Sequence, residues 1–250
     1  MKKLLTGSIT AAFAIAFIAA PNAYALHNAE HYALFGDAAY VSPGNASNRA
    51  VDLVSDPGFS GIDYGVEEGT TFADLTTLST DFKPESDDTC LGGSPRFQIN
   101  LTDPVSGDEG NVFVYLGTDS ASLPCVPGVW QNSGDLLEVT KLVDTSQLGG
   151  TFYQPYALAL AQFGTYEVTG IQLVVDASWA FADSEQAVQV DNTMINSTLF
   201  TYEVPVPSSK DECKNGGWMT MGDDSGRMFK NQGDCVSYSA SKGKNKAAGI

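Results

Sequence analysis

The residues best suited to acid–base or metal chemistry are two histidines and a glutamate near the start of the chain. His27 and His31 are the only histidines, and they flank Glu30 in the sequence HNAEH. On a helix, the two imidazoles would share a face beside the glutamate, an arrangement that binds zinc and activates water. The segment runs directly into the strand-like residues 31–41, so we expect a polar lead into a strand rather than a zinc helix. Because the chain has no other histidine, histidine-dependent catalysis is not expected.

Carboxyl groups are the abundant functional groups of this chain. Residues 26–207 hold 25 Asp and Glu residues against four Lys and Arg, a net charge of −21. A pair of carboxylates is sufficient for glycoside hydrolysis, so a hydrolase remains an alternative, although no spacing singles out one pair. The same charge repels phosphate groups, which excludes nucleic acid as an expected partner. Its simplest consequence is solubility.

Three aspartates follow or precede strand-like runs late in this acidic region. Asp176 and Asp183 bound the loop between two such runs, and Asp191 ends the second run. Carboxylate oxygens presented by loops are ligands that calcium prefers. The sequence therefore predicts a possible calcium site at these three residues, with solvated acidic loops as the alternative. No other cofactor is indicated.

Two tryptophans, Trp130 and Trp179, lie among glycine and small residues in loop-like surroundings. An exposed indole offers a flat apolar face on which a sugar ring can stack. We therefore predict both as candidate ligand-binding residues, with burial as loop plugs being the alternative.

Four cysteines are spaced as two pairs along the chain, namely Cys90, Cys125, Cys213 and Cys235. Three pairings are possible, and each sequential pair lies within one region of uniform composition. We predict the disulfides Cys90–Cys125 and Cys213–Cys235, because an even count in an exported chain favours bridges. Zinc is the rival interpretation, but no Cys-x-x-Cys spacing supports it.

The first 25 residues carry the features of a secretory signal peptide. Lys2 and Lys3 precede an apolar run, and Ala23-Tyr24-Ala25 provides a small-x-small cleavage site. We predict residues 1–25 as this signal and a secreted, extracellular protein. No later apolar run approaches the roughly 20 residues of a membrane span, so an integral membrane protein is not expected.

Short strand-like runs separated by turns fill residues 26–204. Phe97, Ile99 and Leu101 alternate on one face, and residues 112–116 form an apolar run that suggests a central strand. In residues 166–176 the alternation changes phase at Gly170, which predicts a β-bulge. A single short helix is expected over residues 155–163. The pattern predicts a mainly β fold, an antiparallel jelly-roll β-sandwich with one short helix.

The charge balance changes after this region. Residues 205–209 (PVPSS) form a proline-stiffened linker, residues 210–241 a small two-cysteine module, and residues 242–250 a polar tail expected to be disordered. A module this small needs its disulfide, packed by Trp218 and Phe229, as a substitute for a large core.

Two segments resemble known protein classes. The arrangement IQLVVDASWAF…VQVDNTMINSTLFTYE is similar to the last strands of secreted jelly-roll domains of the carbohydrate-binding-module class, many of which end in a VDN-x-x-(V/I)N strand. In that class an aspartate at the position of Asp191 often helps hold a structural calcium with an acidic residue of the first strand. The resemblance implies a sandwich that binds polysaccharide or cell-wall glycan.

The segment SKDECKNGGW…FKNQGDCVSY resembles a small C-terminal module of bacterial secreted proteins whose function is unknown. The matching positions are Cys213, Gly216, Gly217, Trp218, Phe229, Asn231, Gln232, Gly233, Cys235 and Val236. This resemblance implies export and no particular activity.

These observations predict a secreted or cell-surface binding protein without catalytic activity, with glycan as the expected ligand. A structural surface or matrix protein without a small ligand and a carboxylate-dependent glycoside hydrolase are the alternatives.

Overall fold

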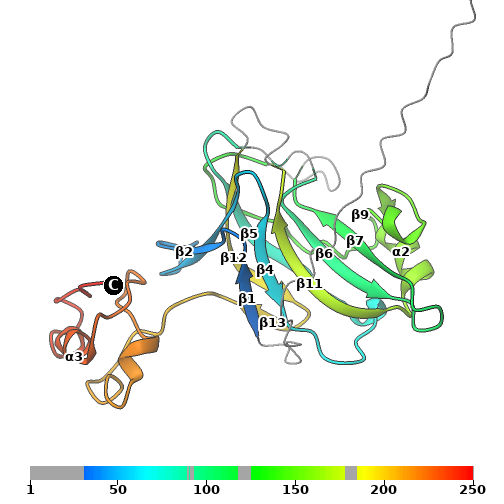
Figure 1. Ribbon diagram of the computed structural model, residues 1–250. Helices are drawn as coiled ribbons and strands as arrows, with labels where there is room; N and C mark the ends of the chain where they lie inside the picture. Colours follow the sequence, from blue (N-terminus) through cyan, green and yellow to red (C-terminus); the bar gives the residue numbers. More distant parts are fainter. Residues whose placement is uncertain (1–30, 89, 91–92, 118–124, 178–184, 250) are drawn as a thin grey trace, which may run out of the picture.

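The computed structural model describes residues 31–88, 90, 93–117, 125–177 and 185–249 of the chain. Two antiparallel sheets pack face to face in a β-sandwich, as predicted (Figure 1). The expected signal peptide, Trp179 and Asp183 lie outside the described residues. Within the described residues, no helix is both long and apolar enough to cross a bilayer.

The first sheet has five strands in the order β1-β4-β11-β6-β7. Its strands are β1 (Tyr32–Phe35), β4 (Ser60–Tyr64), β11 (Glu167–Val175), β6 (Arg96–Thr102) and β7 (Glu109–Tyr115). The predicted bulge is confirmed, because the register between β11 and β6 shifts between Val168 and Gly170. This shift keeps apolar residues on the core side of β11 before and after Gly170.

The second sheet has the order β2-β3-β12-β5-β8, with β13 paired to β12. Its strands are β2 (Ala39–Val41), β3 (Ala50–Ser55), β12 (Gln186–Ile195), β5 (Leu78–Pro84), β8 (Gln131–Asn132) and β13 (Thr198–Phe200). A β-strand turns alternate side chains to opposite faces. One set from each sheet therefore forms a common core, and its fully buried members include Leu53, Ile62, Phe82, Phe97, Ile99, Ile171, Leu173 and Val188.

Short elements close the side of the sandwich next to β7 (Figure 1). They are the 3-10 helices η1 (Phe72–Asp74) and η2 (Ser146–Leu148), the strand pair β9 (Leu142–Val143) and β10 (Gln154–Pro155), and helix α2 (Tyr156–Phe163). Pro155 stands at the N-cap of α2, where its missing N–H costs nothing, and buried Tyr156, Ala159 and Phe163 join α2 to the core. The one helix expected in the sandwich is confirmed.

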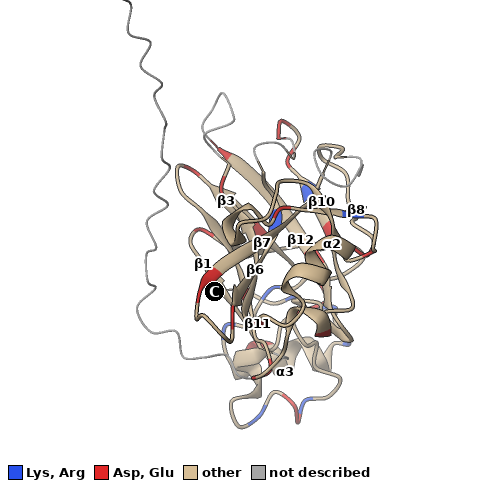
Figure 2. Cartoon of the chain, turned by 90° about the vertical axis from the view of Figure 1, so that its right-hand side faces the viewer, with Lys and Arg blue, Asp and Glu red and all other residues tan. Residues whose placement is uncertain are grey.

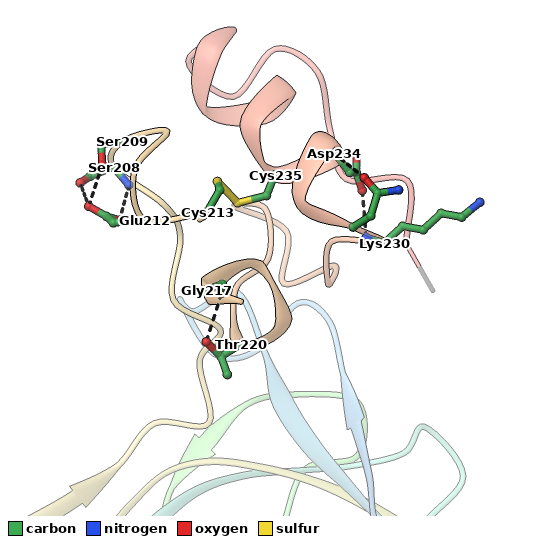
Figure 3. The surroundings of a disulfide bond; sticks show 10 residues. Ser208, Ser209, Glu212, Cys213, Gly217, Thr220, Lys230, Asp234 and Cys235 are labelled. Atoms are coloured by element: carbon green, nitrogen blue, oxygen red, sulfur yellow. Dashed lines mark hydrogen bonds between the residues drawn. A yellow bond between two sulfur atoms is a disulfide. The ribbon is translucent and has the colours of Figure 1, made fainter. Parts of the chain in front are cut away.

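Both predicted disulfides are present, Cys90–Cys125 and Cys213–Cys235. The second bridge joins the segment before 3-10 helix η4 (Gly217–Thr220) to helix α3 (Gln232–Ala240) (Figure 3). Phe229 and Tyr238 pack beside it with ring centroids 5.4 Å apart, and Trp218 lies partly buried against the same cluster.

Residues 242–249, for which the sequence predicts disorder, lie against this C-terminal segment. Ala247 is buried, and its N–H donates to Oδ2 of the buried Asp223 at 3.0 Å. Lys246 pairs with Asp224. The buried Asp223 carboxylate supplies a strong acceptor, and this gives the polar tail a specific place to bind that composition alone does not reveal.

Candidate ligand-binding face

The outer face of the five-stranded sheet carries a continuous row of polar side chains. Asp63 of β4 lies opposite Gln172 of β11, which in turn lies opposite Gln98 of β6. Gln98 lies opposite Phe113 of β7. Because neighbouring strands are about 4.8 Å apart, four partners in register make a row roughly 14 Å long.

Hydrogen bonds hold these side chains in fixed orientations. Gln172 donates through Nε2 to Asp63 Oδ1. Gln98 Nε2 donates to Gln172 Oε1 at 3.1 Å and to Asn100 Oδ1 at 3.0 Å. A primary amide has two N–H donors and a carbonyl with two lone pairs, so these bonds leave part of its capacity for a ligand. We call the set Asp63, Gln98, Asn100 and Gln172 the amide ladder.

The amide ladder is half-buried, and this changes the electrostatics of its single acid. Burial raises the pKa of Asp63, while the hydrogen bond from Gln172 acts in the opposite direction. An ionised Asp63 accepts hydrogen bonds only, whereas the amides both donate and accept. The ladder as a whole can therefore bind hydroxyl groups, which also both donate and accept hydrogen bonds.

Aromatic rings lie at the β7 end of the ladder. Phe113 and Tyr115 project from β7 with centroids 6.3 Å apart, and Tyr153 lies 5.9 Å from Tyr115. The neighbouring Phe152 is 63% exposed and Tyr153 is 41% exposed. Tyr115 donates through its hydroxyl to the buried Asp144 at 2.7 Å, which fixes the ring under the loop that carries Phe152. Apolar ring faces are thus available to solvent beside the polar row.

Asp176, one of the three predicted calcium ligands, is held in an ion pair at the edge of this face. Both of its oxygens accept from the Arg96 guanidinium at 2.6 Å. The same guanidinium lies 4.8 Å from the centroid of Phe113. A bidentate pair of this kind has strong geometric specificity, so Asp176 orients Arg96 against the aromatic end.

Asp191, the second predicted ligand, is fully buried in the other sheet. Its Oδ2 accepts from Asn45 N at 2.8 Å and from Ser47 Oγ at 2.6 Å, and its Oδ1 accepts from Asn192 N at 2.8 Å. Burial raises the pKa of Asp191, and these three hydrogen bonds oppose that rise. The carboxylate therefore binds the loop around Asn45 and Ser47 to β12.

The structure does not bring Asp176 and Asp191 together. Asp176 and Gln186 both hydrogen-bond to Ser94, and Asp191 lies five residues further along β12. At about 3.4 Å per residue this separation is roughly 17 Å. Across residues 31–88, 90, 93–117, 125–177 and 185–249, no three His, Cys, Asp or Glu side chains cluster closely enough to hold a metal ion.

Asp81 is the partner of Asp191 that sequence reasoning missed. The two residues are in register across β5 and β12. Asp81 accepts from the side-chain amides of Asn45, Asn132 and Asn192 at 2.9, 2.7 and 2.8 Å. Neutral amide donors thus surround the carboxylate of Asp81, which lies on β5 and not on the first strand, where the resemblance implies the acidic calcium partner.

Trp130, the described member of the predicted sugar-binding pair, belongs to the other side of the sandwich. It immediately precedes β8, is partly buried, and has Lys83 Nζ 5.2 Å from its ring centroid. It therefore does not contribute to the amide ladder. The ladder residues themselves had a sequence signal, because the two central outward positions of β6, Gln98 and Asn100, are neutral amides.

Comparisons with known proteins assign no family to this chain. No family model matches the chain, and the search of curated proteins finds no match. Among solved structures, a chain described under "Structural analysis of an exo-beta-agarase" aligns with 16% identity and a TM-score of 0.35. The alignment covers 72% of this chain and 25% of that chain, so the present chain spans about a quarter of its length.

Proposed function

We propose that this chain is an exported binding protein that holds a neutral polysaccharide across the outer face of its five-stranded sheet. The observation that carries the proposal is the amide ladder, which ends on the exposed rings of Phe152 and Tyr153. Sugars present hydroxyls around their rim and C–H groups on their faces. The ladder supplies hydrogen-bond partners for the rim, and the rings supply apolar surface for the face.

The charge of the molecule selects among polysaccharides. Basic positions are few on the sandwich (Figure 2), and the only guanidinium on this face, Arg96, is already paired with Asp176. A uronic-acid or sulfated chain would meet repulsion without a compensating cation. The ligand is therefore an uncharged glycan.

Export supports an extracellular glycan as the ligand. The sequence predicts a signal peptide, and both cysteine pairs form disulfides, which persist in oxidising compartments. Cell-wall or matrix polysaccharides are the glycans that an exported protein meets. Binding, rather than cleavage, is proposed because the row contains one carboxyl group, Asp63, and glycoside hydrolysis generally uses two.

Affinity electrophoresis and calorimetry with soluble glucan, xylan, mannan and galactan test this proposal. The variants Gln98→Ala and Phe152→Ala should weaken binding to the preferred polymer about tenfold each, the effect of losing roughly 1.4 kcal/mol. Val105→Ala is the matched control, because Val105 is 93% exposed in the turn beyond β6 and β7.

Three outcomes would contradict the proposal. If Gln98→Ala and the control bind the polymer with equal affinity, the binding site lies on another surface. Retention in a cell-wall fraction without binding to any polymer would favour a structural matrix protein. If the wild type shortens a polymer and Asp63→Asn does not, the protein is a hydrolase.

A further inference from the structure

A shallow cleft of about 260 Å³ lies on the outer face of the six-stranded sheet, opposite to the amide ladder. Its walls are formed by Lys83, Pro84, Glu85, Ser86, Gly128 and Gln189. The strand register explains the position, because Gln189 of β12 lies between Asp52 of β3 and Lys83 of β5. Alternation of side chains places all three on the solvent side of this sheet.

Hydrogen bonds and a disulfide fix the loop that forms the Gly128 wall of the cleft. Gly128 N donates to Pro84 O at 2.8 Å, which fastens the loop before β8 to the end of β5. Gln131 holds the same loop from inside, since its side-chain amide bonds to the backbone of Val126 and Val129. The Cys90–Cys125 bridge joins the segments that follow Ser86 and precede Val126. The cleft is therefore shaped before any ligand arrives.

The Lys83 ammonium has a defined place in this wall. It lies over the indole of Trp130 at 5.2 Å from the ring centroid. Such a cation–π contact restrains a flexible lysine side chain at the surface. Trp130 is therefore a positioning residue for Lys83 at the edge of the cleft.

Asp52 of β3 lies beside the cleft, in register with Gln189, but is not one of its lining residues. Its Oδ1 is buried and has no hydrogen-bond partner among the residues that the structure describes. Burial raises the pKa of this carboxyl group, nearby Glu85 raises it further, and Lys83 lowers it. The charges of Lys83 and Glu85 in the wall therefore reach Asp52 in the neighbouring strand, whose enclosed Oδ1 is not itself open to a ligand.

We propose that this cleft is a second ligand site, separate from the amide ladder, that takes one unit of a neutral sugar. Glu85 accepts hydrogen bonds from hydroxyls, while Lys83 and the Gln189 amide donate to hydroxyl or ring oxygens. The charges of Glu85 and Lys83 offset each other, and Asp52 beside them adds negative charge, so an acidic sugar is repelled. The volume is near the lower limit of ligand pockets, which restricts the site to a single ring or chain end.

A titration of the isotope-labelled full chain by NMR tests this site independently of the first. The probes are oligosaccharides of glucose, xylose, mannose and galactose, with oligogalacturonate as the acidic control, each to about 10 mM because single-ring sites bind weakly. With the preferred neutral probe, the amide signals of Ser86, Gly128 and Gln189 should shift and saturate. Oligogalacturonate should leave them in place.

Matched variants identify the groups that bind. Gln189→Ala and Lys83→Met should weaken the saturating shifts at least tenfold, whereas Lys141→Met removes an equal charge elsewhere and should leave them unchanged. Gln98→Ala should also leave them unchanged, because Gln98 lies on the opposite sheet. If the proposed function fails but the cleft binds sugar, the signals of Asp63, Gln98 and Phe113 will not shift, whereas those of Ser86, Gly128 and Gln189 will.

Several results would overturn the second site. These are shifts confined to the five-stranded sheet, no shift around Gly128 with any neutral probe, a response to oligogalacturonate alone, or equal affinity of Gln189→Ala and the wild type. A response of the cleft signals to calcium chloride but to no sugar would assign it to a cation instead.

Discussion

At the scale of single residues, the chemistry of an aspartate in this protein depends on its neighbours. Asp176 lies in an ion pair with Arg96, and Asp191 accepts three hydrogen bonds from neutral donors. Both were predicted as calcium ligands from the same loop composition. Asp63, which composition did not distinguish, occupies the proposed binding face instead.

The variant Asp191→Asn measures what this buried carboxylate does. An amide N–H would face at least one of the donors from Asn45, Ser47 and Asn192, so a buried donor would lose its acceptor. We expect a loss of about 2–3 kcal/mol in the free energy of unfolding, measured with urea in a chelating buffer. Asp56→Asn, at an exposed position, is the control.

The same pair of proteins tests the calcium prediction. If calcium binds at Asp191, millimolar calcium raises the melting temperature of the wild type more than sodium at equal ionic strength does. The difference should shrink in Asp191→Asn. Identical melting temperatures in calcium and chelator would leave the carboxylate with its hydrogen-bonding role alone.

At the scale of elements, residues 112–116 show how an apolar run can mislead. Their pattern suggests a central strand, but β7 is at the edge of its sheet, so this prediction is wrong. Val112 and Val114 face the core, and Phe113 and Tyr115 face outward. Residues 144–154 pack along this strand: the Tyr115 ring is buried against Asp144 and Tyr153, and Phe113 and Asp144 exchange backbone hydrogen bonds at 2.9 Å. An edge strand can therefore be apolar on both faces when a loop packs over it.

The Cys90–Cys125 bridge is the element-scale feature that the cleft depends on. Replacing both residues with serine should lower the free energy of unfolding by about 3–4 kcal/mol, since a loop of this length loses closure entropy in the unfolded chain. It should also weaken any ligand binding near Gly128. Urea denaturation and the NMR titration measure these effects.

The Cys213–Cys235 double serine variant is the control for that change. It should destabilise the C-terminal segment while leaving the main unfolding transition and the cleft signals in place. Peptide mapping without reduction should find both bridges in the wild type. Free thiols, or a bridge between the two regions, would contradict the assignment.

At the scale of the whole molecule, the sandwich and the C-terminal segment meet around the loop that contains Asn48. Asn48 exchanges two hydrogen bonds with the backbone of Val204, and Gly222 N donates to Pro205 O. Gly226 has a φ of +77°, and a Cβ there would lie 2.3 Å from Asn48 O, so only glycine fits this approach. Upstream, the Tyr202 hydroxyl is buried in a network with Tyr64 and Thr193.

Two truncations locate the end of the sandwich. A chain that ends at Val204 should retain cooperative thermal unfolding, because it keeps Tyr202 and the pairing with Asn48. A chain that ends at Thr201 should lose several kcal/mol or fail to fold, since it leaves the Tyr64 hydroxyl and the Arg49 Nε without Tyr202. Aggregation of the longer chain would show that residues 205–250 belong to the core.

The dependence of stability on pH follows from the buried acids of the sandwich. Burial raises the pKa of Asp52, Asp63, Asp88 and Asp191. An acid with a higher pKa in the folded state binds more protons when folded, so stability falls as pH rises between the unfolded and folded pKa values. In the sandwich, lowered acidic pKa values belong to the exposed Asp74 and Asp103, where solvent weakens the effect.

We therefore expect the urea midpoint to rise as the pH is lowered from 7 to about 5 at constant ionic strength. The formal net charge of −17 adds to this trend, because protonation reduces repulsion within the folded chain. A midpoint that falls steadily over the same interval would show that paired carboxylates dominate instead.

Local patterns in the sequence were sufficient for strands such as β6 and β11, the bulge at Gly170, helix α2 and the sequential disulfides. Each of these depends on alternation, on a proline or glycine at a boundary, or on cysteine spacing within one region. The β-sandwich class follows from the same short-range signals. The C-terminal residues 242–249 illustrate the limit, because their polar composition does not reveal the acceptor at Asp223.

Only the tertiary structure decided which side chains share a face. Asp63, Gln98 and Gln172 come from three strands whose order β4-β11-β6 differs from their order along the chain. Asp176 and Asp191 are closer in sequence than Gln172 is to Asp63 or Gln98, yet Asp176 follows β11 of one sheet and Asp191 lies on β12 of the other. Pairing between distant strands is selected by packing of the common core, so the outward row that it creates is a consequence of long-range contacts that no local sequence pattern contains.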